Sequence, residues 1–150
     1  MIQTSIVVPI RTRPNQNTRD CPPVDALLGL AGKLRDTRAL IVADHGLDLM
    51  CGLIRCGCLA ATTLRIGDRP DTDDYDLVLV PDAGLLSSPD DVIRLARRSL
   101  GLNGRLIAGV APGSAATALA RRLRLNGFVA LRSVHLAAVT LLRADLRRHS

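Results

Sequence analysis

The amino-acid sequence predicts one α/β domain in which a mostly parallel β-sheet lies between two layers of helices. Short apolar segments alternate along the chain with longer segments of helical character, as strands alternate with helices in βαβ units. Hydrophobic residues make up 47% of the 150 residues and charged residues 23%, so the chain can fill a core on both faces of a sheet. The core is aliphatic, because Tyr75 and Phe128 are the only aromatic residues.

The first part of the chain predicts an extended arm followed by a helix. Residues 5–10 are β-prone, and the polar, turn-rich stretch 11–19 follows them. Residues 24–34 carry leucines with the spacing of one helix face. We therefore assign residues 1–23 to an extended N-terminal arm and residues 24–146 to the core of a single domain that comprises the whole chain.

Four short apolar runs predict the parallel strands: 38–43, 60–66, 75–80 and 105–110. Pro81 stops the third run, because proline has no N–H to donate to a sheet. Two further runs, 128–134 and 138–142, are joined by a tight connection and predict a final pair of strands.

Three segments between these runs predict helices. Residues 47–58 are apolar almost all round, which predicts a buried helix. A serine suited to the N-cap, a proline and two acids occupy 88–91 and predict the start of a second helix, which the turn 101–104 closes. A third helix is expected to begin after Pro112 and to reach about residue 125.

Three further segments occur in a characteristic order. Residues 76–82 read Asp-Leu-Val-Leu-Val-Pro-Asp, residues 100–107 contain an approximate L-x-x-G-G-x-L sequence, and residues 123–128 match L-x-x-x-G-F. From residue 38 to residue 146 this order resembles the class I SAM-dependent methyltransferase family. The resemblance implies a Rossmann-like three-layer sandwich whose mostly parallel sheet ends in a C-terminal antiparallel hairpin. It also implies S-adenosylmethionine as the cofactor.

The cofactor motif departs from the pattern of that family. Its first strand normally leads into a G-x-G-x-G turn, whose bare backbone approaches the cofactor. Residues 43–47 read Ala-Asp-His-Gly-Leu, so one glycine remains and His45 stands where bare backbone is expected. The family's second strand ends in a carboxylate for the cofactor ribose, whereas here Arg65 lies near that point and Asp68 follows later. The motif is therefore interpreted as degenerate.

The chain is also shorter than the family pattern. Between the runs 60–66 and 75–80 the family has a helix and a further strand, but only the polar stretch 67–74 is present here. We therefore expect the fold to lack one strand–helix unit. The strand at 60–66 would then lie at an edge of the sheet with unpaired backbone groups. The other candidate to cover that edge is the same strand of a second molecule, which would make a two-fold dimer with a continuous sheet. We favour residues 5–10, from the same chain or from a swapped partner, and hence expect a homodimer.

The candidate cofactor-binding residues follow the strands: Asp44, His45, Gly46, Asp68 and Asp82. Open α/β sheets bind ligands beyond the carboxyl ends of their strands, which favours a functional interpretation of 44–46. The alternative is structural: Asp44 would cap the following helix, and the dipole of that helix would favour the negative charge of Asp48. Both interpretations stay open, and no catalytic residue is assigned.

Other chemistries are not expected. Cys51, Cys56 and Cys58 lack the C-x2-C spacing of zinc sites, so we expect reduced, mostly buried thiols and no metal. The aspartates of the segment 68–76 do not have the spacing of a calcium-binding loop. The net charge is +6, but its arginine bias matches a GC-rich genome, so nucleic acid is not an expected partner. No signal peptide or membrane span is evident, which predicts a cytoplasmic protein that does not contact membranes.

Two functions fit these observations. The favoured one is a methyltransferase-like domain that no longer catalyses and serves as a scaffold or interaction module, with no cofactor. The alternative is an active small SAM-dependent methyltransferase with an atypical S-adenosylmethionine site. The volume of the pocket near residues 43–47 and the binding of S-adenosylmethionine distinguish the two.

Overall fold

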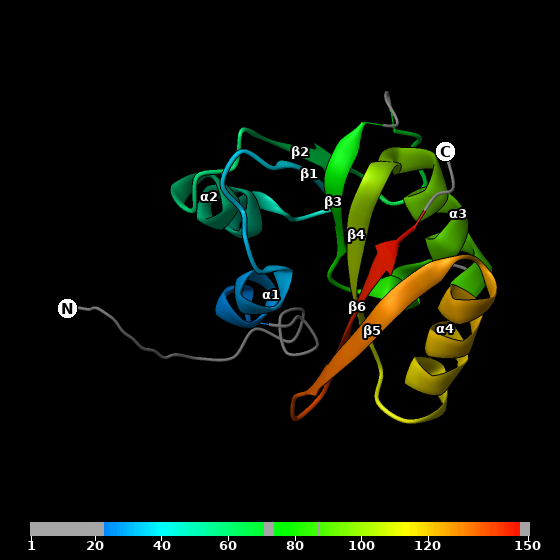
Figure 1. Ribbon diagram of the computed structural model, residues 1–150. Helices are drawn as coiled ribbons and strands as arrows, with labels where there is room; N and C mark the ends of the chain where they lie inside the picture. The colour runs from blue at the N-terminus through cyan, green and yellow to red at the C-terminus, as the bar shows by residue number, and fades with distance from the viewer. Residues whose placement is uncertain (1–22, 71–73, 87, 148–150) are drawn as a thin grey trace.

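The computed structural model describes residues 23–70, 74–86 and 88–147. In these ranges the elements follow one another along the chain in the order α1 (Val24–Ala31), β1 (Arg38–Val42), α2 (Leu47–Arg55), β2 (Ala60–Leu64), β3 (Tyr75–Val80), the short 3-10 helix η2 (Ala83–Leu85), α3 (Pro89–Ser99), β4 (Leu100–Val110), α4 (Ser114–Leu125), β5 (Phe128–His135) and β6 (Thr140–Leu146). Helices lie on both sides of one twisted sheet (Figure 1).

The sheet has six strands in the order β2-β1-β3-β4-β6-β5. Strands β1 to β4 pair in parallel, and β6 and β5 form an antiparallel hairpin against β4. The mostly parallel sheet with a C-terminal hairpin is therefore confirmed. Between β2 and β3 the described residues, 65–70 and 74, contain no helix or strand, so the fold lacks the strand–helix unit as predicted.

Two hydrophobic cores fill the space between the sheet and its helices. Alternate residues of each central strand point to opposite faces. On β1, Leu40 and Val42 pack toward α3 and α4, whereas Ala39 and Ile41 pack toward α1 and α2. This two-sided burial explains why the parallel strands are continuous apolar runs in the sequence.

The start of α3 has the cap that the sequence predicts. The Ser88 hydroxyl accepts a hydrogen bond from the Asp91 N–H at 3.4 Å, and Pro89 is the first helical residue. Strand β4, in contrast, begins at Leu100 and not at Arg105, because the expected turn is an irregular part of the strand. Its register with β3 shifts there, and a Cβ on Gly104 would lie 2.7 Å from Leu100 Cδ2.

Helix α2 differs from the prediction of a helix that is buried on all sides. It ends at Arg55, and 68% of Leu47 and 51% of Ile54 are exposed. The cysteines also differ from the prediction: of the three in the described residues, Cys51 and Cys56 are exposed free thiols and Cys58 is buried. The reason is that one face of α2 packs on the sheet, while no described element covers its outer flank.

Two arginines join α1 to the sheet. Arg105 of β4 donates from Nε to the Ala31 carbonyl at 2.9 Å and from Nη2 to the Lys33 carbonyl. Arg143 of β6 donates to the Leu30 carbonyl at 3.0 Å. Carbonyls at the C-terminal end of a helix have no partner within the helix, so these guanidinium groups satisfy them.

Some predictions fall outside the described residues. The expected strand at 5–10 and most of the extended arm at 1–23 lie there. Within the described part of the chain, no helix combines the length and the apolar character that a membrane crossing requires.

Candidate functional site

The candidate site lies where the parallel strands β1, β2 and β3 end. Because their carboxyl ends meet at one edge of the sheet, the loops 43–46, 65–70 and 81–86 are neighbours there. These loops contain the five residues that the sequence singles out. The structure distributes them over three separate places.

Asp44, His45 and Gly46 border the first place, an open cavity of about 390 Å³ beside the start of α2. The other residues that line it are Ala43, Leu47, Asp48, Met50, Thr63 and Arg65. Ligand pockets commonly measure about 300–1,000 Å³, so this cavity is within that range. Its lining combines carboxylates, an imidazole and a guanidinium.

The Asp44 carboxylate connects two loops. Its Oδ1 accepts a hydrogen bond from the Ile66 N–H at 3.2 Å, and the neighbouring Ala43 N–H donates to the Leu64 carbonyl at 3.0 Å. These bonds extend the pairing of β1 and β2 beyond both strands. The structural alternative for Asp44 is therefore wrong in detail, because Gly46 occupies the N-cap of α2 and no side chain caps that helix.

Gly46 does not have the backbone conformation that favours glycine, because its φ is −104°. Its lack of a side chain matters for packing instead: a Cβ there would lie 3.0 Å from Ile41 Cγ2. His45 is exposed in the same turn. Asp48 is the acid in the first turn of α2, where the helix dipole favours a negative charge.

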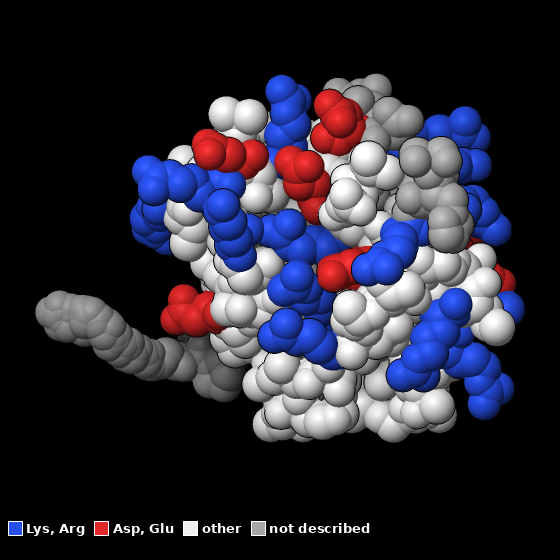
Figure 2. Space-filling view, in the orientation of Figure 1, with Lys and Arg blue, Asp and Glu red and all other residues white. Residues whose placement is uncertain are grey.

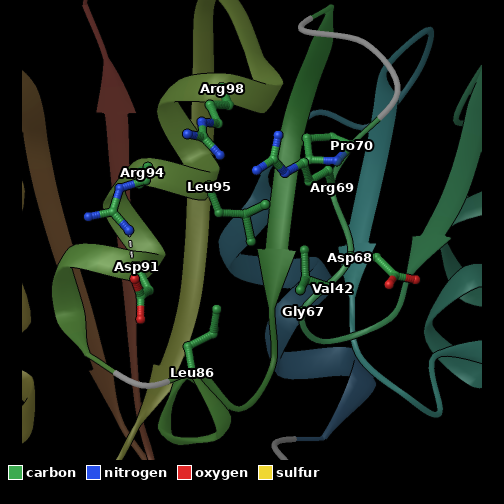
Figure 3. A pocket seen from close by; sticks show the side chains of 10 residues that line it. All are labelled: Val42, Gly67, Asp68, Arg69, Pro70, Leu86, Asp91, Arg94, Leu95 and Arg98. Atoms are coloured by element: carbon green, nitrogen blue, oxygen red, sulfur yellow. Dashed lines mark hydrogen bonds and ion pairs between the residues drawn. The ribbon is translucent and has the colours of Figure 1, made fainter.

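Asp68 borders the second place, a cavity of about 170 Å³ between the loop after β2 and helix α3 (Figure 3). Arg69 and Arg98 point toward one another across it, and Asp68 points away from them. Arg94 is held by Asp91, whose Oδ1 lies 2.7 Å from Arg94 Nη1. The floor is apolar and contains Val42, Leu86 and Leu95.

Asp82 lies in the third place, the turn after β3. Its Oδ1 accepts a hydrogen bond from the Gly84 N–H at 3.1 Å and caps η2. Next to this turn is a mostly apolar cavity of about 190 Å³ that sequence reasoning missed. It is lined by Ala83, Gly84, Leu86, Ser88, Pro89, Val92, Val110, Ala111, Ala115 and Leu119. The signal in the sequence was the set of small residues that follow two adjacent strands.

The described residues include three of the four cysteines, Cys51, Cys56 and Cys58. Within the described ranges, no three His, Cys, Asp or Glu side chains are grouped so that they could hold a metal ion. Burial raises the pKa of the Cys58 thiol above its usual value, and the nearby Cys56 acts in the same direction. Cys58 therefore stays protonated and packs as a small apolar side chain.

Comparison with solved structures identifies the fold. The chain is similar to a SAM-dependent methyltransferase from Aquifex aeolicus, with a TM-score of 0.68 and 9% identity over 88% of this chain and 94% of that one. A putative S-adenosylmethionine-dependent methyltransferase from Listeria monocytogenes gives a TM-score of 0.66 and 12% identity over 83% and 97%. A SAM-dependent O-methyltransferase from Thermotoga maritima gives 0.65 and 12% over 99% and 69%.

The structural class is therefore that of the class I SAM-dependent methyltransferase fold, as the sequence resemblance implies. No protein-family model and no curated protein matches the sequence. At these identities the similarity establishes the fold, and function has to be argued from the residues at the strand ends.

Proposed function

We propose that this chain is a methyltransferase-fold domain that has lost cofactor binding and serves as a scaffold or interaction module. The observation that carries the proposal is that the Asp44 carboxylate is engaged in a hydrogen bond within the protein. Its carboxylate holds the Ile66 N–H at 3.2 Å and so ties the two loops that would have to receive the cofactor. A carboxylate in this bridge has less capacity to accept hydrogen bonds from a ligand.

The charge at the end of β2 supports the same conclusion. The family resemblance implies a carboxylate there, which accepts hydrogen bonds from the ribose hydroxyl groups. Arg65 lines the cavity instead, and a guanidinium group can only donate hydrogen bonds. Its positive charge also disfavours a ligand that carries a sulfonium and an ammonium group. Arg65 and the bridged Asp44 therefore both oppose the binding of S-adenosylmethionine.

An active small SAM-dependent methyltransferase is the second candidate function. The cavity of about 390 Å³ beside Asp44, His45 and Gly46 favours it, because this volume is within the range of ligand sites. Asp68 and Asp82 would then contribute from the neighbouring loops. Methyl transfer depends chiefly on positioning the reacting groups, so it would require few catalytic side chains.

Isothermal titration calorimetry with S-adenosylmethionine and S-adenosylhomocysteine tests the proposal. We expect no binding, or dissociation constants above about 10 μM, which corresponds to less than about 6.8 kcal/mol of binding free energy. Tighter binding of either compound would overturn the proposal in favour of the second candidate.

The variant Arg65→Glu adds a matched comparison. It restores a carboxylate at the end of β2 on an exposed side chain, so the fold should be unaffected. If the charge at this position opposes the cofactor, the variant binds S-adenosylmethionine more tightly than the wild type. Weaker binding by the variant would show that Arg65 belongs to a working site.

A further inference from the structure

Helix α2 presents an apolar stripe to the outside of the molecule. Leu47, Cys51 and Ile54 have the i, i+4, i+7 spacing of one helix face, and all three are exposed. Leu49 and Leu53 occupy the opposite face and are buried against the sheet. An apolar stripe on each side of one helix is typical of a helix with a second packing partner.

Strand β2 lies beside this helix, and its outer edge is not covered by any part of the chain that the structure describes. Its register with β1 is continuous from Ala60 to Leu64, and no described strand pairs with its other side. The Leu64 carbonyl accepts from the Ala43 N–H on the β1 side, so the polar groups of Ala61 and Thr63 point outward. No proline, charge or bulge interrupts β2. Such an edge is a template for another strand.

The stripe and the edge form one continuous surface. Leu47 and Met50 of α2 line the same cavity as Thr63 of β2. An added strand alone, such as one formed by residues 5–10, would pair with the edge but leave Leu47 and Ile54 in water. A partner that covers the whole surface must bring a strand and an apolar helix in the same arrangement. A second copy of α2 and β2 has this arrangement.

We propose that two copies of this chain associate through β2 and α2 about a two-fold axis that passes between their Thr62 residues. Antiparallel pairing in this register places Ala61 of each copy opposite Thr63 of the other. These are the residues whose N–H and C=O groups point outward, so both pairs exchange hydrogen bonds. The Thr62 side chains face one another, a favourable cross-strand pair. The interface is closed, because each copy uses the same surface.

The helices fit the same axis. Helix α2 packs on both β1 and β2. Because neighbouring strands lie about 4.8 Å apart, a helix centred between these two strands lies about 10 Å from its symmetry mate, close to the ~8–10 Å of packed helices. The two helices run antiparallel, so the start of each helix lies beside the end of the other. Leu47 then packs near the partner's Ile54.

Light scattering on the full chain tests the proposal. The wild type is expected at twice the chain mass of 16.0 kDa. Thr62→Lys places two ammonium groups directly opposite one another and is expected to weaken dimerisation at least about 100-fold. Ile54→Asp is expected to act in the same direction from the helix side. Both positions are exposed, so circular dichroism and thermal unfolding should show an intact fold.

Ser133→Lys is the matched control, because it adds the same charge at an exposed position on β5, the opposite edge of the sheet. This variant should remain dimeric. A wild-type mass of one chain would overturn the proposal, and would mean that the edge is bare or is covered within the chain. A mass above two chains would overturn it too. So would a dimer that withstands both Thr62→Lys and Ile54→Asp.

Discussion

The two edge strands of the sheet, β5 and β2, differ in how readily they can pair with an added strand. At one end, β5 carries a register shift between Val129 and Arg132, a positive φ of 56° at Ala130, and the exposed charge of Arg132. Each of these features discourages the addition of another strand. At the other end, β2 is regular, short and uncharged. We call β4, β6 and β5 the finished flank, and α2 with β2 the open flank.

The difference coincides with the position of the absent strand–helix unit. The finished flank keeps all the elements that the methyltransferase fold implies, and its hairpin closes over α4. The open flank is where the unit would follow β2, and it also contains the altered cofactor turn at 43–47. The absent unit and the turn that the sequence analysis interprets as a degenerate cofactor motif therefore lie on the same side of the molecule. Figure 2 shows that basic side chains, in contrast, occur across the whole visible face.

Removing core volume should distinguish the flanks most strongly. Leu106 of β4 is fully buried, so Leu106→Ala is expected to lower the free energy of unfolding by about 3 kcal/mol. Leu47→Ala on the open flank should change it by less than about 0.5 kcal/mol in the Thr62→Lys background, because Leu47 is exposed in one chain. Urea unfolding measures both values. Equal losses would remove the distinction between the flanks.

The arginine connection of the finished flank should give the next largest effect. Arg105→Met removes the donors that satisfy the Ala31 and Lys33 carbonyls and is expected to cost about 2 kcal/mol of unfolding free energy. Arg98→Met removes an exposed guanidinium and should cost less than about 0.5 kcal/mol. If the two variants unfold at the same urea concentration, Arg105 does not hold α1 to the sheet.

The helix caps allow a smaller comparison. Ser88→Ala removes the side chain that accepts from the Asp91 N–H and is expected to cost about 1 kcal/mol. Ser88→Thr retains an acceptor and should cost much less. Thermal unfolding of the two variants separates the cap from other effects of the substitution. A loss of the same size in both would mean that the hydroxyl group does not stabilise α3.

The thiols should show the smallest effect, which is one of rate. The fourth cysteine, Cys21, lies outside the described residues, so the test uses a Cys21→Ser background. There Cys51 and Cys56 should react rapidly with a disulfide reagent, and Cys58 at least about 10-fold more slowly. Burial raises the pKa of Cys58, so its thiolate fraction is low at neutral pH and its reaction should accelerate at higher pH than that of the exposed thiols. Three equal rates would contradict the burial of Cys58.

The sequence was sufficient where a local signal set a boundary. The bounds of β3 follow from an apolar run that stops at Pro81, and the start of α3 follows from Ser88 and Pro89. The order of strands and helices also predicted the edge position of β2. For β3 and α3, neighbouring residues carry the information.

Contacts between distant residues were beyond sequence reasoning. Asp44 binds the N–H of Ile66, and Arg143 reaches the carbonyl of Leu30, so neither role is visible in the adjacent sequence. The exposed stripe on α2 was misjudged for a related reason. Its apolar composition indicates burial, but whether a partner element is present depends on the whole fold.

Hydrogen–deuterium exchange at two protein concentrations tests the difference between the flanks most directly. At the concentration that gives a dimer, we expect the outward amides of Ala61 and Thr63 to be protected. After about 100-fold dilution these amides should exchange rapidly, whereas the amides of β6 should remain protected at both concentrations. Protection of Ala61 and Thr63 that does not change on dilution, or its absence at both concentrations, would contradict an open flank that a second copy covers.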